Sequence, residues 1–174
     1  MTIFTIGHST RSLDEFLALL RAHSITQLGD VRTVPKSRRH PHFAGAALAT
    51  SLADAGIAYR HLPALGGLRK PRRDSKNSAW RHEGFRGYAD YMESKEFNEA
   101  IDDLIAWAGA PGVRTAVMCA EAVWWRCHRQ LIADALVARN VTVQHIQTAK
   151  SAPEHKLTEF ARIDGTGVSY PGLV

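Results

Sequence analysis

The stretch VMCAEAVWWRCHRQLIADAL, residues 117–136, places two cysteines, a glutamate, two tryptophans, two arginines and a histidine between an apolar strand and an apolar helix. The run over 113–120 is typical of a strand buried in a parallel sheet, and 126–140 has the periodicity of a helix with one apolar face. Open parallel sheets bind ligands beyond the carboxyl ends of their strands, where each strand leads to its helix. The stretch therefore indicates an α/β fold and locates its candidate site.

The rest of the chain repeats this alternation of strands and helices. Strands are predicted over 3–6, 25–32, 57–63, 113–120 and 141–147. Helices are predicted over 12–23, 44–56, 85–92, 94–109 and 126–140. Ser12 and Glu15 predict a capping box for the first of these helices, and Ser94 is the expected N-cap of the fourth. Right-handed crossovers would place these helices on both faces of the sheet. The pattern predicts one α/β domain over 1–174, a three-layer sandwich around a Rossmann-like parallel sheet of about five strands in the order 3-2-1-4-5. A C-terminal tail over 149–174 is expected to be partly frayed, with a short helix over 153–163.

The composition fits a single buried core. With 45% apolar residues, a chain of 174 residues can bury such a core without disulfides or metals. The chain has no apolar run of roughly 18 residues and no leader at its N-terminus, which indicates a cytoplasmic protein without a membrane span. Cys119 and Cys127 are expected to be reduced thiols rather than a disulfide framework. No metal site is predicted, because the chain lacks C-x2-C and H-x3-H spacings, and no motif identifies a cofactor.

Positive charge is concentrated in one part of the chain. The net charge is +5, and residues 32–81 hold eleven of the 22 lysines and arginines against only Asp54 and Asp74. Such a region attracts nucleotides, phosphates or nucleic acid, or is simply a solvated basic surface. The loop over 64–80 is expected to be a lid, a nucleic-acid contact or a solvated loop. The candidate phosphate or nucleic-acid contacts are Arg38, Arg69, Lys70, Arg72 and Arg73.

Polar residues follow three of the predicted strands at the ends where the apolar runs stop. These are GHSTR (7–11), GDVR (29–32) and CAE (119–121). Because parallel strands have their carboxyl ends at one edge of the sheet, these groups are expected to lie together. The predicted ligand-binding residues are Gly7, Ser9, Asp30, Arg32, Trp125 and Arg126, and the candidate catalytic residues are Cys119, Glu121, His8 and His128.

Several of these residues also have a purely structural interpretation. Backbone N–H groups of GHST could bind an anion at a helix N-terminus, or Ser9 or Ser12 could cap that helix. Asp30 could bind ribose hydroxyls or pair with Arg32 or Arg11. Trp124 and Trp125 could stack on a base or a sugar, or cover the core.

Cys119 and Glu121 are the two candidates for the reacting group. A helix beginning near Trp125 or Arg126 would turn its N-terminus and the Arg126 guanidinium toward Cys119, and both favour a thiolate. The layout resembles the cysteine loop of phosphatases and sulfurtransferases, but the spacing is C-x6-R and the loop lacks the glycines of a phosphate cradle. Glu121 is expected in a partly apolar pocket beside Trp124 and Trp125, where it could act as a base or a nucleophile, or could hold Arg126 or Arg129 in place.

TIGHS, DVR, LGG, NSAWR, FRGYADYM and MCAE followed by RCHR together resemble a widespread bacterial family, domain of unknown function family 488. The resemblance extends from Thr5 to about Ile146. It implies an α/β fold and supports the site residues without assigning their roles: His8, Asp30, Arg32, Cys119, Glu121, Arg126 and His128. Many relatives have proline where this chain has Val123 or Trp124, a departure that changes the turn.

The sequence is compatible with two functions. In one, the protein is a hydrolase or transferase acting on a nucleotide or another phosphorylated small molecule, with Arg32 and Arg126 holding the anion and His8 or His128 moving protons. In the other, it is a nucleic-acid-binding accessory protein that uses the basic region 32–81. The cluster of Cys, Glu and His side chains at the strand ends favours the enzyme. The sequence carries no signal for the oligomeric state.

Overall fold

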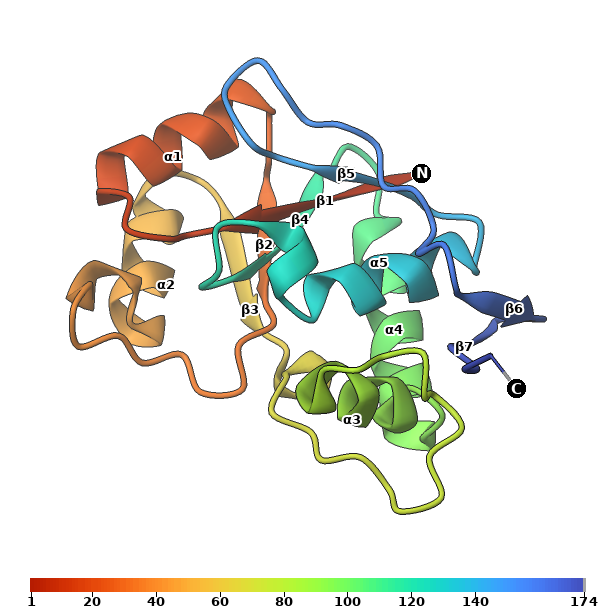
Figure 1. Cartoon of the computed structure of the whole chain (residues 1–174). Coiled ribbons are helices and arrows are strands. Elements are labelled where there is room, and N and C mark those ends of the chain that lie inside the picture. The colour runs from red at the N-terminus through yellow and green to blue at the C-terminus, as the bar shows by residue number, and fades with distance from the viewer. Residues whose placement is uncertain (174) are drawn as a thin grey trace.

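The protein is built around a five-stranded parallel sheet (Figure 1). The computed structural model describes residues 1–173. The strands of the sheet are Thr2–Gly7 (β1), Gln27–Asp30 (β2), Ala58–His61 (β3), Thr115–Cys119 (β4) and Thr142–His145 (β5). The parallel Rossmann-like α/β class predicted from the sequence is therefore confirmed.

The order of the two central strands differs from the prediction. β4 lies between β2 and β1, so the order is β3-β2-β4-β1-β5 rather than 3-2-1-4-5. β1 and β4 are both apolar and almost completely buried, so either strand suits a central position and composition cannot choose between them. The exchange still leaves the three polar strand ends adjacent, because Gly7 pairs with Cys119 and Asp30 with Met118.

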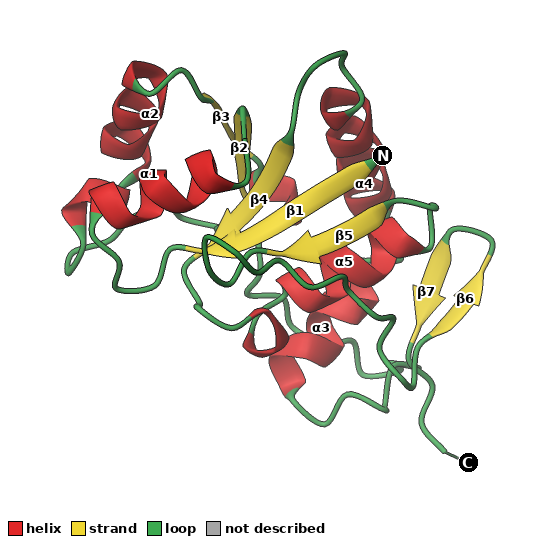
Figure 2. Cartoon of the chain, turned by 90° about the horizontal axis from the view of Figure 1, so that it is seen from above, coloured by secondary structure: helices red, strands yellow, loops and turns green. Residues whose placement is uncertain are grey.

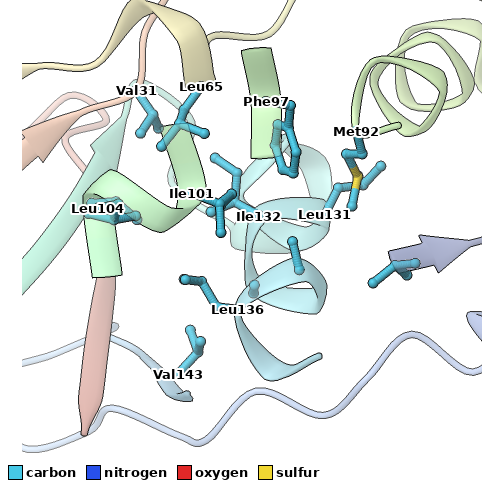
Figure 3. Close-up of a cluster of buried hydrophobic side chains, with 14 of the residues drawn as sticks. Val31, Leu65, Met92, Phe97, Ile101, Leu104, Leu131, Ile132, Leu136 and Val143 are labelled. Atoms are coloured by element: carbon cyan, nitrogen blue, oxygen red, sulfur yellow. The ribbon is translucent and has the colours of Figure 1, made fainter. Parts of the chain in front are cut away.

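Helices cover both faces of the sheet, which gives the three layers (Figure 2). One face is covered by Leu13–Ala22 (α1) and Gly45–Asp54 (α2). The other is covered by Glu83–Tyr91 (α3), Lys95–Ala108 (α4) and Arg129–Val137 (α5). Short 3-10 turns lie at Pro41–Phe43 (η1), Pro63–Leu65 (η2) and Trp124–Arg126 (η3). On the second face, Ile101 and Leu104 of α4 pack with Leu131 and Leu136 of α5, as Figure 3 shows.

The predicted helix signals operate as capping contacts. Ser12 accepts a hydrogen bond from the Glu15 N–H at 3.1 Å while the Glu15 carboxylate accepts one from the Ser12 N–H at 3.3 Å. This is the predicted capping box at the start of α1. Ser94 caps α4 in the same way, by accepting from the Phe97 N–H at 3.2 Å.

The last long helix begins later than predicted. The sequence placed its start near Trp125 or Arg126, but α5 begins at Arg129. Cys127 has an extended backbone, with φ −142° and ψ 155°, and therefore interrupts the helix after η3. Arg126 thus belongs to the turn, and Cys127 takes the place beside the helix N-terminus.

The predicted helix over 153–163 is wrong. The segment is irregular, with a turn at 159–160, and leads into an antiparallel hairpin formed by Arg162–Asp164 (β6) and Gly167–Ser169 (β7). Its physical cause is the buried carboxylate of Asp134, which accepts hydrogen bonds from His155 Nε2 at 2.8 Å and from the Thr158 N–H at 3.0 Å. These contacts hold the segment against α5 and compete with helix formation.

The loop over 64–80 is folded against α3. The Asp90 carboxylate accepts hydrogen bonds from the Asn77 amide, from the Ser75 hydroxyl and from the Arg72 N–H at 2.7, 2.7 and 2.8 Å.

None of the helices within residues 1–173 has the length and apolar character that crossing a membrane requires.

Candidate functional site

Two cysteine sulfurs meet at the carboxyl end of β4. Cys119 is the last residue of β4, Cys127 lies just before α5, and their Sγ atoms are 2.6 Å apart. Both side chains are free thiols, and both are buried. The sequence predicts reduced thiols but does not predict that the two sulfurs are in contact.

The two thiols have opposite tendencies to ionise. Burial raises the pKa of the Cys119 thiol well above its ordinary value, and the contact with Cys127 raises it further. Burial also opposes ionisation of Cys127, but its hydrogen bonds with Cys119 and His128 and the charge of Arg129 outweigh it, so the Cys127 pKa lies well below its ordinary value. Cys127 is therefore the cysteine of the pair that ionises more readily, whereas the sequence suggested Cys119.

His128 is oriented to take the proton of Cys127. Its Nε2 lies 2.9 Å from the backbone carbonyl of Val31, and a carbonyl can only accept, so Nε2 carries the hydrogen. In the neutral ring this leaves a lone pair on Nδ1, which lies 3.6 Å from the Cys127 sulfur. The ring also packs against Tyr88, with centroids 5.2 Å apart. A thiol, a proton acceptor and a group that fixes the acceptor are the components of an activated nucleophile.

Arg129 stabilises the turn after β4 through hydrogen bonds to its backbone carbonyls. It is only 1% exposed, and its Nη2 donates to the backbone carbonyl of Glu121 at 2.5 Å and to that of Ala122 at 3.4 Å. Its own backbone N–H points at the Cys127 sulfur, 3.4 Å away. The sequence pattern directs Arg126 toward the cysteine, but in the structure it is the buried guanidinium of Arg129 that fixes the loop.

Gly7 is required where β1 passes beneath this turn. A Cβ at Gly7 would overlap the backbone carbonyl of Glu121. Ser9, two residues on, donates its N–H to the Ala120 carbonyl at 2.9 Å and has a left-handed φ of 50°. The predicted ligand residues Gly7 and Ser9 therefore act on the turn through backbone contacts.

Asp30 and Arg32 form a buried ion pair. The guanidinium donates to both carboxylate oxygens, from Nε at 2.9 Å and from Nη2 at 2.7 Å, and the Tyr59 hydroxyl adds a third bond at 2.6 Å. Of the two roles that the sequence left open for Asp30, this is the structural pairing. Arg32 still contributes to the wall of a cavity described below.

His8 lies beside this ion pair. Its Nδ1 is 2.9 Å from the Ser9 carbonyl, and its Nε2 is 3.4 Å from Arg32 Nη1. Burial lowers the His8 pKa to about 4, and the charge of Arg32 contributes in the same direction. The imidazole stacks on Phe43 with centroids 4.3 Å apart and is neutral at neutral pH.

A cavity of about 450 Å³ opens beside the cysteine pair. Its basic wall residues are Arg32, Lys36, His82, Arg126 and His128. Among the residues that the structure describes, Glu121 is the one carboxylate in this wall. Cys119, Cys127, Phe85 and Tyr88 also line it. The cavity thus combines a thiolate with an excess of positive charge, which suits an anionic ligand.

A second cavity of about 490 Å³ lies on the other side of the CAE turn. Its polar wall residues are His8, Ser9, Thr10, Ser37, Arg38, Arg39, His40 and Glu121. Ala120 and Glu121 line both cavities. The turn after β4 is therefore a wall shared by two hollows, each with basic side chains.

Other predicted residues lie away from these cavities. Trp125 is 48% exposed and lines neither, while Trp124 stacks on His145 with centroids 4.3 Å apart. Arg69 lies over the ring of Tyr91, with its guanidinium carbon 3.6 Å from the centroid. Arg72 pairs with Glu93 at 2.5 Å, and Lys70 and Arg73 are exposed.

Sequence reasoning missed Cys127 as the more reactive cysteine and missed Lys36 and His82 in the wall. The signal for Cys127 was present: the chain leaves the strand end at Cys119 and returns at the start of a helix after eight residues. A cysteine just ahead of a helix N-terminus is where a thiolate is favoured.

Comparison with known proteins locates the chain in a family. Neither the curated proteins nor the solved structures contain a match. The family described as Domain of unknown function DUF488 matches residues 12–136, which include β2, β4, the cysteine pair and nearly all of α5. Because this match spans well over half of the 174 residues, the chain belongs to the DUF488 family.

Proposed function

We propose that the protein is an enzyme that binds a phosphorylated small molecule, such as a nucleotide, in the cavity beside β4 and attacks it with the thiolate of Cys127. The observation that carries this proposal is the position of Cys127: a buried sulfur in the wall of a basic cavity, within reach of the free lone pair of His128. Nucleophilic catalysis by cysteine needs this combination of a lowered thiol pKa and a neighbouring base.

The basic residues of the cavity wall have two separate roles, anion binding and proton transfer. Lys36 and Arg126 are exposed at the rim, where they can hold the anionic group of the substrate. The thiolate then forms a bond to the electrophilic atom while the bond to the leaving group breaks, and the protonated His128 supplies the proton that the leaving group needs. A hydrolase passes the bound group to water, and a transferase passes it to a second acceptor.

This proposal replaces the two reacting groups favoured by the sequence. Cys119 retains its proton, and the Glu121 side chain is exposed and accepts the Ala122 N–H at 3.1 Å. Glu121 is better suited to discriminating among ligands, since it is the carboxylate that both cavities share. A ligand extending around the turn would contact both hollows, as a dinucleotide or a nucleoside phosphate can.

A thermal-shift screen tests the binding step. The purified protein is heated with nucleotides, sugar phosphates, inorganic anions and short oligonucleotides, and compared with the Lys36→Ala and Arg126→Ala variants. A phosphorylated small molecule should raise the unfolding temperature, and each variant should weaken its binding by about five- to tenfold without lowering the stability of the unliganded protein. Lys76→Ala, an exposed lysine outside the cavity wall, is the matched control.

Nucleic-acid binding is the second candidate, and the exposed pair Arg38 and Arg39 in the second cavity favours it. In that case only oligonucleotides would stabilise the protein, and their affinity would fall steeply with salt. Substituting Cys127 would then leave the affinity for oligonucleotides unchanged. Stabilisation by oligonucleotides alone, independent of Cys127, would contradict the enzyme proposal.

A further inference from the structure

The contact between Cys119 and Cys127 is more than an aid to ionisation. A disulfide bond is about 2.05 Å long, and the two sulfurs already lie 2.6 Å apart. Both cysteines line the cavity beside β4, so a small oxidant can reach sulfurs that are otherwise buried. Forming a bond between them requires only a small movement of the turn between β4 and α5.

The surroundings give the two sulfurs different tasks. Cys127 faces His128 Nδ1 at 3.6 Å and the Arg129 N–H at 3.4 Å, and both favour a nucleophilic thiolate. Besides Cys127, Cys119 contacts the backbone carbonyl of Glu121, whose oxygen lies 4.0 Å from the Cys119 sulfur. A carbonyl oxygen can only accept a hydrogen, so this contact favours the thiol form of Cys119. This division between an attacking and a resolving cysteine is typical of redox-active pairs.

We propose that Cys119 and Cys127 form a redox-active pair, oxidised to a disulfide by a peroxide and reduced again by a dithiol. In the first step the Cys127 sulfur attacks one peroxide oxygen, the O–O bond breaks, and the leaving hydroxide takes the proton held by His128. Cys127 becomes a sulfenic acid. In the second step Cys119 attacks the Cys127 sulfur, the S–S bond forms, the S–O bond breaks, and water leaves with the Cys119 proton. Two thiols lose two electrons and two protons, and hydrogen peroxide becomes two molecules of water.

Reduction runs through thiol–disulfide exchange. A thiolate of the dithiol attacks one sulfur of the pair, and its second thiol releases the mixed disulfide, so the dithiol is oxidised as the pair is reduced. If the proposed function holds, oxidation also removes the catalytic thiolate and disables the enzyme. The redox chemistry itself does not depend on that function and needs no substrate.

Intact-protein mass measurement tests the pair. The reduced full-length protein is treated with hydrogen peroxide, unfolded in excess iodoacetamide and weighed. The expected product is a monomer that has lost two hydrogens and takes up no carbamidomethyl group, and dithiothreitol should restore two alkylation sites. Two alkylated cysteines after peroxide treatment, or disulfide-linked dimers as the main product, would overturn the proposal.

Single substitutions separate the roles. The Cys119→Ser variant should accumulate a sulfenic acid on Cys127 that dimedone traps, whereas Cys127→Ser should give at least about tenfold less trapped product. Equal trapping in both variants would contradict the assigned roles. The wild-type mass measurement decides whether the disulfide forms even if one variant fails to fold. Because no ligand is present, failure of the ligand screen leaves this result untouched.

Discussion

At the scale of single residues, the chemistry depends on how three groups surround one sulfur atom. His128, fixed by its bond to the Val31 carbonyl, offers a lone pair to Cys127, while Arg129 offers a backbone N–H and a nearby positive charge. Burial alone would make both cysteines inert thiols. Specific hydrogen bonds outweigh burial at Cys127 but not at Cys119, which separates two otherwise similar residues.

The first prediction concerns the pH dependence of alkylation. Cys127 faces Cys119 from β4, His128 and Arg129 from the start of α5, and Tyr88 from α3. Because its pKa is lowered, its reaction with iodoacetamide should persist at neutral pH and decline only as the pH falls through the lowered value. Peptide mapping should show Cys127 labelled at least about tenfold faster than Cys119 at pH 7. Similar rates and one ordinary thiol titration for both residues would contradict the assignment.

The second prediction concerns His8 and stability. Its pKa of about 4 in the folded protein lies below the unfolded value of 6.5, so between these values the unfolded chain binds a proton that the folded protein does not. Stability should therefore fall as the pH drops from about 6.5 to about 4, by up to about 3 kcal/mol from this residue. Urea unfolding of wild type and His8→Gln across this range checks it; the variant should lose less stability on acidification.

The sequence identifies most of the residues around the candidate site but not Cys127 as the reactive cysteine. The polar ends of β1, β2 and β4 could be brought to one edge because strand direction follows from parallel crossovers. The spacing of the two cysteines hinted that Cys127 lies near a helix N-terminus, but its contacts with Cys119 and His128 depend on the extended backbone between η3 and α5, which the sequence does not show. Glu121 was placed in an apolar pocket, but the turn instead exposes it.

At the scale of elements, a buried relay joins the C-terminal segment to the turn. The Asp134 carboxylate accepts from His155, His155 Nδ1 lies 2.9 Å from His145 Nε2, and His145 Nδ1 lies 2.6 Å from the Thr5 hydroxyl. Arg129 reaches that hydroxyl from the other side, at 3.5 Å. The relay therefore connects α5, β5 and β1 with the segment 153–163, for which the sequence pattern predicts a helix that the structure does not contain. Its side chains override local propensity, which is why sequence periodicity failed there.

The third prediction tests this relay. Asp134→Asn removes a buried charge that accepts bonds from His155, Thr158 and Tyr170, and should destabilise the fold by about 3 kcal/mol. Tyr170→Phe removes only one of these bonds and should cost about 1 kcal/mol. Urea unfolding measures both. Asp164→Asn, at an exposed position in the hairpin, is the control and should change stability by less than about 0.5 kcal/mol. Equal stabilities for all three variants would show that the relay does not anchor the segment.

At the scale of the whole molecule, the sheet order determines which groups share a cavity. With β4 between β2 and β1, the CAE turn separates two hollows, one toward Arg32 and the other toward His8. The sequence predicted the class of fold but not this order, because β1 and β4 are equally apolar. The prediction that the polar strand ends lie together does not depend on this order, because exchanging two neighbouring strands does not separate their carboxyl ends.

The fourth prediction addresses the whole cavity through its reactive sulfur. The rate at which iodoacetamide labels Cys127 is measured in the reduced protein, with and without the phosphorylated compound that most raises the unfolding temperature. If that compound occupies the cavity beside β4, labelling of Cys127 should slow by at least about tenfold at saturation, and Arg126→Ala should restore it at the same ligand concentration. A compound that stabilises the protein while leaving the labelling rate unchanged would bind elsewhere, and would contradict a substrate site built around Cys127.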